Sequence, residues 1–194
     1  PGFQPFDPSQ FQTYGYANHP NVITSLEFER ILSASGPTDG QVRRPSDGAV
    51  PKSIAFVQCA GSRDETLGVE YCSRICCMYA IKQAMLLSGA LPLADITIYY
   101  MDIRTFGKGY EQFYQNARAM GIEFVKGKVA RITEDEGQNP IVRVELIDED
   151  SRVVERPHDL VVLSVGMVPG FDPRAVYHVP VAGDGFVDLP SSNI

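Results

Sequence analysis

Four cysteines are the residues of this chain best suited to chemistry. Cys59, Cys72, Cys76 and Cys77 are the only cysteines among its 194 residues, and their spacing is C-x12-C-x3-C-C. A disulfide framework spreads its bridges over a small secreted fold, so this crowding indicates metal or redox chemistry instead. Four thiolates around one point are what a [4Fe–4S] cluster requires.

The turn that follows Cys59 supplies small and charged residues beside the thiols. It contains Gly61, Ser62 and Arg63, which we assign as cofactor-binding residues. A tetrathiolate cluster is anionic, so Arg63 would add positive charge, as would Arg74 and Lys82. Gly61 would let the backbone approach the cluster closely.

Other interpretations of the cysteines stay open at this point. A zinc site usually has paired C-x-x-C ligands, and the adjacent Cys76 and Cys77 fit poorly around one small tetrahedral ion. A disulfide or thiol-redox pair, Cys72–Cys76 or Cys76–Cys77, is a second alternative. Buried structural cysteines are a third.

The surrounding residues predict how the cysteines are positioned. Apolar runs indicate strands at 53–59, 96–101 and 160–165, with helices at about 70–88 and 110–120 between them. A helix from about Glu70 would place Cys72 and Cys76 at i and i+4 on one face. The carboxyl ends of parallel strands and the amino ends of the following helices meet at one edge, where ligands bind.

This alternation predicts an α/β fold. We expect a Rossmann-like three-layer domain over residues 51–170, with a parallel sheet, helices and a small antiparallel β-meander near 128–156. Residues 1–50 are expected to form an extended arm that lies on another surface, a short strand at 21–24, a helix capped by Ser25, and a linker. Residues 171–194 form a second connecting segment.

Charge and hydropathy exclude several functions. The chain has 17 Lys and Arg against 24 Asp and Glu, for a net charge of −7, and no basic run. This argues against binding to nucleic acid or to an anionic membrane surface. No apolar run is long enough to insert in a membrane and no signal peptide is visible, so we expect a cytoplasmic protein. Because the chain starts at Pro1 without Met, we expect it to be a piece of a longer protein.

Two stretches carry a family resemblance. Residues 56–64 (FVQCAGSRD) and 71–84 (YCSRICCMYAIKQA) resemble the iron–sulfur signature of the heterodisulfide reductase A-subunit family. They also resemble related flavoprotein subunits of quinone-interacting oxidoreductases. Residues 21–30, 102–110 and 162–169 extend the resemblance. It implies an electron-transferring oxidoreductase with a thioredoxin-reductase-like body that binds FAD, and a [4Fe–4S] cluster ligated by Cys59, Cys72, Cys76 and Cys77.

The resemblance also implies a place within a larger architecture. The chain would be a domain of FAD/NAD(P)-binding type, with residues 1–50 and 171–194 leading from and back to an FAD half. It has no G-x-G-x-x-G and no ferredoxin-type C-x2-C-x2-C. We therefore expect FAD to be bound by the parent protein and the isolated piece to be inactive. Expected partners are the parent's FAD and ferredoxin domains and other subunits of a multi-subunit redox complex. Gly166 would approach the flavin-side hinge, an ordinary turn being the alternative.

An alternative function is a pyridine-nucleotide domain of a thioredoxin-reductase-like flavoenzyme. The first turn then reads C-A-G-S-R-D, with one glycine where three are expected, and Asp102 and Arg104 would meet the ribose and a phosphate. We favour a loop-anchoring role for Asp102 and Arg104, with the cluster displacing the dinucleotide. A non-catalytic module with zinc or disulfide cysteines is the remaining alternative.

Overall fold

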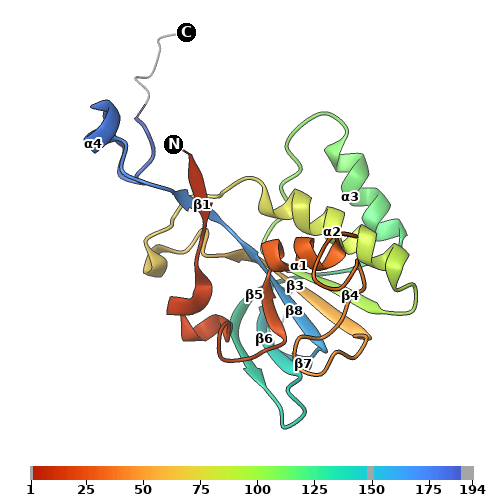
Figure 1. The fold of residues 1–194 in the computed structure, drawn as a ribbon. Helices are drawn as coiled ribbons and strands as arrows, with labels where there is room; N and C mark the ends of the chain where they lie inside the picture. The colour runs from red at the N-terminus through yellow and green to blue at the C-terminus, as the bar shows by residue number, and fades with distance from the viewer. Residues whose placement is uncertain (1, 148–150, 189–194) are drawn as a thin grey trace.

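A seven-stranded mixed sheet forms the centre of the molecule (Figure 1). A computed structural model describes residues 2–147 and 151–188 of the chain. The strand order is β2-β8-β3-β4-β5-β6-β7. The strands are β1 Phe3–Pro5, β2 Val22–Thr24, β3 Ser53–Ala60, β4 Asp95–Tyr100, β5 Glu123–Glu134, β6 Pro140–Leu146, β7 Val153–Pro157, β8 Leu160–Val165 and β9 Met167–Pro169. The helices are α1 Ser25–Leu32, α2 Cys76–Ala90, α3 Tyr110–Ala119 and α4 Arg174–Tyr177, with 3-10 turns at Pro8–Gln10, Gln12–Tyr14 and Glu65–Leu67.

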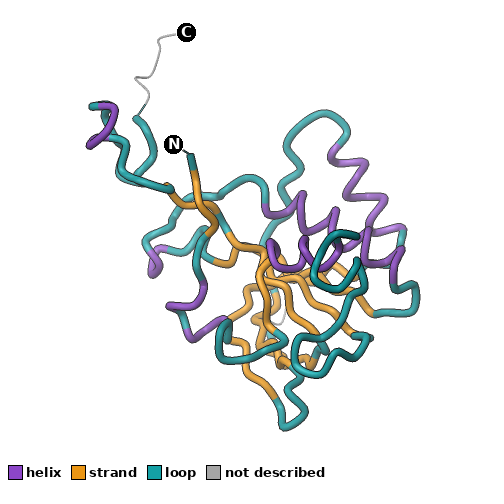
Figure 2. Tube along the Cα trace, in the orientation of Figure 1, coloured by secondary structure: helices purple, strands orange, loops and turns teal. Residues whose placement is uncertain are grey.

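Three layers follow from the alternation of side chains along the strands. Ile54 and Phe56 of β3 belong to the core that includes Ile81 of α2, whereas Ala55 and Val57 belong to the core that includes meander residues such as Val142. A strand sends successive side chains to opposite faces, so both faces of the parallel sheet are covered. Figure 2 shows the three longer helices α1, α2 and α3 gathered on one side of the strands. The predicted Rossmann-like three-layer α/β fold with an antiparallel meander is confirmed.

One long strand connects the parallel and antiparallel parts of the sheet. We predicted an antiparallel meander near 128–156, and its first strand, β5, begins earlier, within the parallel part of the sheet. It starts parallel to β4, with Thr97 opposite Glu123, and continues antiparallel to β6, with Gly127 opposite Leu146. A Cβ on Gly127 would lie 2.6 Å from the carbonyl oxygen of Glu145, so the change of partner requires a glycine there.

The N-terminal residues pack on this domain itself. The prediction that residues 1–20 lie on another surface is incomplete, because Phe6 and Tyr14 are buried on the meander side of the sheet. β1 pairs antiparallel with β9. β2 forms an edge of the sheet beside β8.

Helix α1 begins with a capping box one residue earlier than predicted. The N-cap is Thr24, whose hydroxyl accepts from the Glu27 N–H, while the Glu27 carboxylate accepts from the Thr24 N–H. Ser25 is therefore the first helical residue and not the cap. Thr24 is the cap because it has Glu27 at the third helical position, which completes the reciprocal pair of bonds.

Helix α2 starts at Cys76, not near Glu70 as we predicted. The preceding residues are held in a loop by Ser73, whose hydroxyl accepts from the Met167 N–H at 2.8 Å and whose N–H donates to Ser62 Oγ at 3.3 Å. Arg74 has a left-handed backbone, with φ +63°, which interrupts a helix. The predicted i, i+4 relation between Cys72 and Cys76 is therefore wrong, because only Cys76 is helical. Helix α3 matches its prediction to within one residue.

Candidate metal centre

All four cysteines lie where the carboxyl end of β3 meets the amino end of α2. Cys59 is in β3, Cys72 is in the following loop, and Cys76 and Cys77 are the first two residues of α2. All four are free thiols; Cys76 and Cys77 are buried, while Cys59 and Cys72 are half-buried. The end of β3 and the start of α2 thus bring Cys59 close to Cys76 and Cys77, which are 17 and 18 residues away in the sequence.

Burial and the neighbouring thiols affect the ionisation of Cys59 and Cys76. Burial raises the pKa of Cys59 to about 11, and negative charge on Cys77 and Cys72 raises it too. Burial also raises the pKa of Cys76 to about 12, to which Cys59, Cys77 and Cys72 add. Reactive cysteines have lowered pKa values, so Cys59 and Cys76 are not activated nucleophiles. Binding to a cation is the natural way to deprotonate such a group.

The amino end of α2 offers an electrostatic environment suited to an anion. No side chain caps this helix, and its first turn has no acidic residue. The N–H groups of Cys76 and Cys77 are at the helix start, where no intrahelical acceptor exists. The positive end of the helix dipole therefore faces the site. In the loop, the Arg74 N–H donates to Cys72 Sγ at 3.4 Å.

A β-bulge reorients Cys59. Val57 and Ala60 lie opposite Leu163 and Val165, so three residue steps on β3 match two on β8. Cys59 has φ +60°, and Arg63 nearby has φ +58°. Left-handed backbone at a non-glycine residue is uncommon and costs roughly 1 kcal/mol, and such strain concentrates at functional sites. Bulges likewise re-aim side chains beside active sites. Sequence reasoning missed this feature because the strand pattern of residues 53–59 is unbroken.

Two buried polar side chains near this edge are unsatisfied. Gln58 is 8% exposed and Ser164 is fully buried. Neither amide atom of Gln58 nor the hydroxyl of Ser164 has a hydrogen-bond partner. Buried polar groups are nearly always bonded, so these atoms fit a bound group that accepts or donates hydrogen bonds. We did not predict either residue, although a polar residue at the end of an apolar strand is a visible signal.

The described residues present no preformed site for a single metal ion. Among residues 2–147 and 151–188, no three or more His, Cys, Asp or Glu side chains are grouped so as to hold a metal ion. A tetrahedral zinc needs its sulfurs about 3.8 Å apart, given a Zn–S distance of about 2.3 Å. A [4Fe–4S] cluster would instead bind each thiolate to a different iron.

The predicted turn residues hold the cysteine loop in place. A Cβ on Gly61 would lie 2.0 Å from the Phe6 ring, so Phe6 fills the space that we predicted for backbone approach to the cluster. Ser62 Oγ donates to the Tyr71 carbonyl at 2.8 Å. A Cβ on Gly166 would lie 2.8 Å from Ser73 Oγ and 2.9 Å from the Gly61 carbonyl. These close contacts fix the loop of Cys72 against the ends of β3 and β8.

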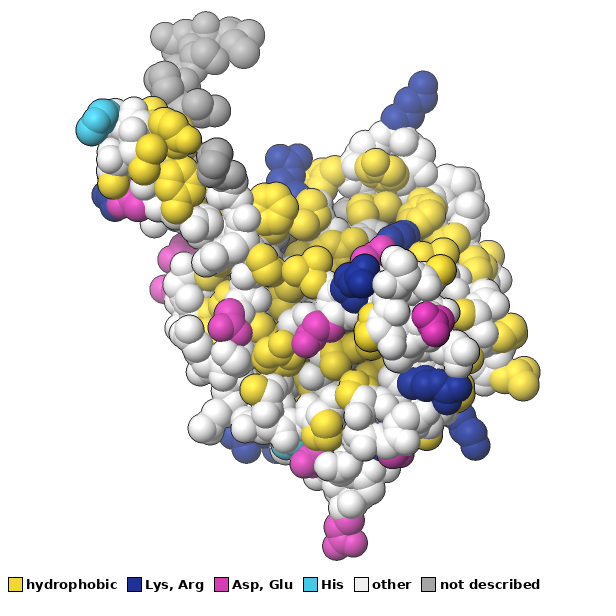
Figure 3. Space-filling view, in the orientation of Figure 1, with side chains coloured by type: hydrophobic (Ala, Val, Ile, Leu, Met, Phe, Trp, Pro, Cys, Tyr) yellow, Lys and Arg dark blue, Asp and Glu magenta, His cyan; other side chains and the backbone are white. Residues whose placement is uncertain are grey.

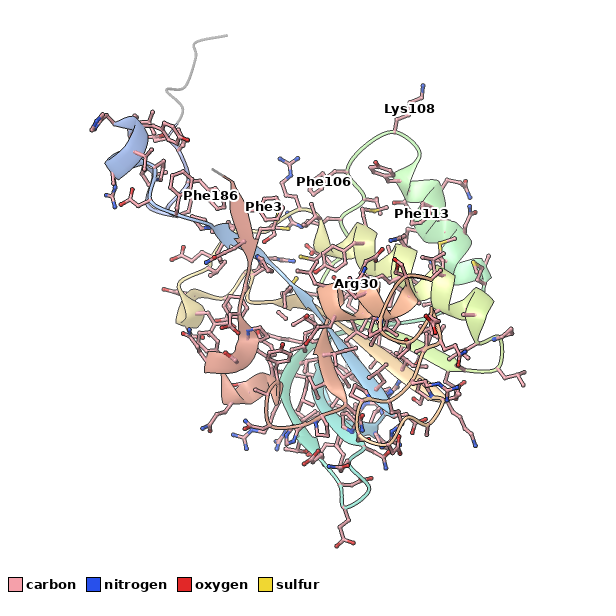
Figure 4. The ribbon with its side chains drawn as sticks, viewed as in Figure 1. Phe3, Arg30, Phe106, Lys108, Phe113 and Phe186 are labelled. Atoms are coloured by element: carbon pink, nitrogen blue, oxygen red, sulfur yellow. The ribbon has the colours of Figure 1, made fainter. Side chains whose placement is uncertain are left out.

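Three arginines lie near the cysteines, whereas Lys82, which we predicted to add positive charge there, pairs with a residue of α1. Arg63 pairs with Asp102, which also accepts from Arg104 Nη2 at 3.1 Å. Asp102 therefore links the first turn to the end of β4, as expected of a loop anchor. Arg74 stacks on Phe106 at 4.5 Å, and Figure 4 shows Phe106 on the β4–α3 loop near the start of α2. Lys82 instead pairs with Glu29 of α1, so it adds no free charge to the cysteines.

Comparison with known proteins agrees with the family resemblance. The chain is 54% identical over 172 residues to an iron–sulfur A-subunit, the second of its kind, of the CoB–CoM heterodisulfide reductase of Methanopyrus kandleri. It is 49% identical over 172 residues to the A-subunit of the H2:CoB–CoM heterodisulfide, ferredoxin reductase of Methanothermobacter thermautotrophicus. Each alignment covers 87% of this chain and 26% of the relative, so the chain spans about a quarter of the length of these relatives. No family model matches. The resemblance to the heterodisulfide reductase A-subunit family is confirmed for this segment.

Solved structures confirm the fold type. Thioredoxin reductase of T. acidophilum matches with a TM-score of 0.55 and 13% identity, over 98% of this chain and 50% of that one. An NAD-dependent persulfide reductase from A. fulgidus matches with a TM-score of 0.53 and 13% identity, over 95% of this chain and 28% of that one. The chain therefore shares the α/β fold of part of each of these proteins.

Proposed function

We propose that this chain is the cluster-bearing domain of an electron-transferring oxidoreductase of the heterodisulfide reductase type. Cys59, Cys72, Cys76 and Cys77 would together ligate one [4Fe–4S] cluster. The observation that carries the proposal is the convergence of all four cysteines at the uncapped amino end of α2, where each lies at the edge of the same sheet. The family resemblance supports the same set of four.

The protein's part in the chemistry is to hold and tune the group. When bound, a [4Fe–4S] cluster accepts and returns one electron at a potential that its surroundings set. The cysteines supply negative thiolates, which the helix dipole and the nearby arginines balance. Burial of Cys76 and Cys77 keeps water from the ligands. The thiols therefore act as ligands, and no acid–base step is assigned to them.

The parent protein would contain the remaining parts. We propose that it binds FAD outside residues 51–170 and that the paired strands β1 and β9 connect this domain to that half. The connecting segment 171–194 includes residues 189–194, which lie outside the described part of the chain. Partners would be other subunits of a redox complex and the ferredoxin domains of the parent. In the part of the chain that is described, no helix is long and apolar enough to cross a membrane.

Anaerobic reconstitution with iron and sulfide tests the proposal. We expect a reduced sample to give the EPR spectrum of a paramagnetic [4Fe–4S] cluster, and we expect Cys76→Ser and Cys77→Ser to lose it. Ser33→Ala, a change of one exposed hydroxyl far from the cysteines in sequence, is the control and should keep the spectrum. A chain that takes up one stable zinc and no iron would rule the proposal out.

A further inference from the structure

We infer that Gln58 and Ser164 donate hydrogen bonds to the sulfur atoms of the proposed cluster and raise its reduction potential. This inference rests on the proposed function. It names two positioning residues that are not ligands and that lie on neighbouring strands.

The first observation is that the polar atoms of both side chains are buried and unused. Gln58 Nε2, Gln58 Oε1 and Ser164 Oγ have no hydrogen-bond partner, although Gln58 is only 8% exposed and Ser164 is not exposed at all. Leaving a buried donor unsatisfied costs about 1–3 kcal/mol. Two adjacent strands that each carry such a group indicate a shared acceptor.

The register places the two residues opposite one another on neighbouring strands. Ser164 lies between Leu163 and Val165, the partners of Val57 and Ala60, so it is opposite the bulge that contains Gln58 and Cys59. The bulge interrupts the alternation of β3 at Gln58, which lines a cavity together with Cys59 and Arg63. On β8, Leu160 and Val162 face the helices, and the alternation places position 164 on the same side.

The helix above these positions is the one that carries two of the ligands. Cys76 Sγ lies 3.5 Å from the Val165 carbonyl oxygen, directly after Ser164 in β8. Cys59 directly follows Gln58 in β3. Gln58 is therefore next in sequence to the proposed ligand Cys59, and Ser164 is next to Val165, whose carbonyl contacts the proposed ligand Cys76.

The nearest protein acceptor on β8 is already in use. The Val165 carbonyl accepts from the Tyr79 hydroxyl at 2.7 Å. Gln83 lies two turns further along α2 than Cys76; its amide nitrogen donates to the Ser25 carbonyl and to Glu29, while its amide oxygen has no partner. The sulfurs of a cluster held by the four cysteines would supply acceptors at the end of the sheet where Gln58 and Ser164 lie.

The chemistry fixes the direction of the effect. Reduction adds one negative charge to the cluster, and a hydrogen-bond donor stabilises that additional charge. A donor therefore raises the reduction potential, and its removal lowers it. A hydrogen bond to a charged group contributes about 1.5 kcal/mol, which is about a tenfold change in the reduction equilibrium. For a one-electron couple this corresponds to about 59 mV.

An EPR-monitored redox titration of the reconstituted 194-residue chain tests the inference. Gln58→Met keeps the length of the side chain and removes both polar atoms, and Ser164→Ala removes the hydroxyl alone. We expect each variant to bind the same amount of iron as the wild type, with a midpoint potential lower by up to about 59 mV. Gln83→Met is the matched control, because this buried amide lies two turns along α2 from Cys76 and its nitrogen already donates to the Ser25 carbonyl and to Glu29; the potential of this variant should not change.

A loaded Gln58→Met or Ser164→Ala chain with the wild-type midpoint would overturn the inference for that residue. If Gln58→Met fails to bind iron, Gln58→Glu tests the same position, because it keeps the shape and replaces the amino donor with an oxygen. The Glu variant should also lower the midpoint, and a wild-type value would count against the inference. Failure of the wild type to bind iron is a different result, which contradicts the proposed function itself.

Discussion

Burial of the cysteine thiols determines which chemistry is available to them. Two of them sit in surroundings that raise the pKa to about 11 at Cys59 and about 12 at Cys76. A dithiol catalyst requires the opposite, a thiolate that is stable near neutral pH. The same burial suits a metal ligand, because the cation's charge replaces water as the stabiliser of the thiolate. The residue environment thus favours ligation over the disulfide alternative.

Asp102 and Arg104 provide a prediction about pyridine nucleotides. Asp102 already accepts hydrogen bonds from Arg63 and Arg104, so it is not available to the ribose hydroxyls of a dinucleotide. We expect NADH and NADPH titrations of the iron-free chain, followed by fluorescence or calorimetry, to show no micromolar binding. Asp102→Asn is the companion variant and should behave as the wild type does. Micromolar binding that Asp102→Asn abolishes would support the nucleotide alternative.

His158 gives the chain a predictable pH dependence. Its ring is buried between Ser53 Oγ at 2.8 Å and the Tyr99 hydroxyl at 2.9 Å, and burial lowers its pKa to about 4. The unfolded chain, with a histidine pKa near 6.5, binds the proton more readily, so stability is complete above about pH 6.5 and decreases as pH falls toward 4. We expect the free energy of unfolding to be lower at pH 5 than at pH 7 by about 2 kcal/mol from this residue.

Urea unfolding of the iron-free chain at the two pH values measures this difference. His158→Gln is the matched variant, since glutamine can bond the same partners and does not titrate. A difference between pH 7 and pH 5 that is unchanged in His158→Gln would show that other groups cause it.

At the scale of elements, the sequence predicted regular structure better than its interruptions. Strand 160–165 is a continuous apolar run and helix 110–120 is amphipathic, and both were located correctly. The start of α2 was predicted too early, because the hydrogen bonds of Ser73 that exclude a helix come from residues distant in the sequence, Ser62 and Met167. Local propensity carries no information about such contacts.

In the candidate site too, some features could be predicted from the sequence and others could not. The four cysteines were proposed as a site from their spacing and from the family resemblance, and the sheet edge near which they lie follows from the topology of the fold. The bulge at Cys59 and the unsatisfied Gln58 and Ser164 become visible only when β3 and β8 are aligned. Gly61 and Gly166 were recognised as special, but their contacts with Phe6 and Ser73 were not.

Gly166 supports a prediction about the loop that carries Cys72. In Gly166→Ala, the new methyl group would meet the Gly61 carbonyl at 2.9 Å and Ser73 Oγ at 2.8 Å, so the loop must shift. We expect a loss of roughly 1–3 kcal/mol in the free energy of unfolding and less bound iron after reconstitution. Gly89→Ala, on α2 with no atom within 4 Å of the new Cβ, is the control and should stabilise the chain by about 0.5–1 kcal/mol. Equal iron binding by the two variants would show that the packing at Gly166 does not position the ligand loop.

At the scale of the whole molecule, the N-terminal arm has two parts. Phe6 and Tyr14 are buried in the core, whereas Phe3 in β1 is exposed. Figure 1 shows β1 extending from the sheet on the same side as α4. Exposed apolar side chains lie on β1 and on the C-terminal segment 171–188 beside it, namely Phe3, Val176, Tyr177 and Val187. Figure 3 shows apolar atoms on the surface of this part of the molecule, and Figure 4 shows Phe3 and Phe186 there. Such a surface fits the proposed junction with the FAD half.

Substitution of Phe6 and of Phe3 distinguishes the buried part of the N-terminal arm from its exposed part. Phe6 is 7% exposed, packs over Gly61 and belongs to the core, whereas Phe3 is 61% exposed. Phe6→Ala should therefore destabilise the chain by about 3 kcal/mol in urea unfolding, and Phe3→Ala by less than about 0.5 kcal/mol. Similar values for both would mean that the arm does not fold onto the domain.

The central claim is that one [4Fe–4S] cluster is held by all four cysteines. Its most direct test is the iron and sulfide content per chain after anaerobic reconstitution, measured for the wild type and for single Ser variants of the four cysteines. We predict about four irons and about four sulfides per wild-type chain, with a clear loss in each Ser variant. A wild-type chain with one zinc and no sulfide, or iron content that is unaffected by all four substitutions, would contradict the account.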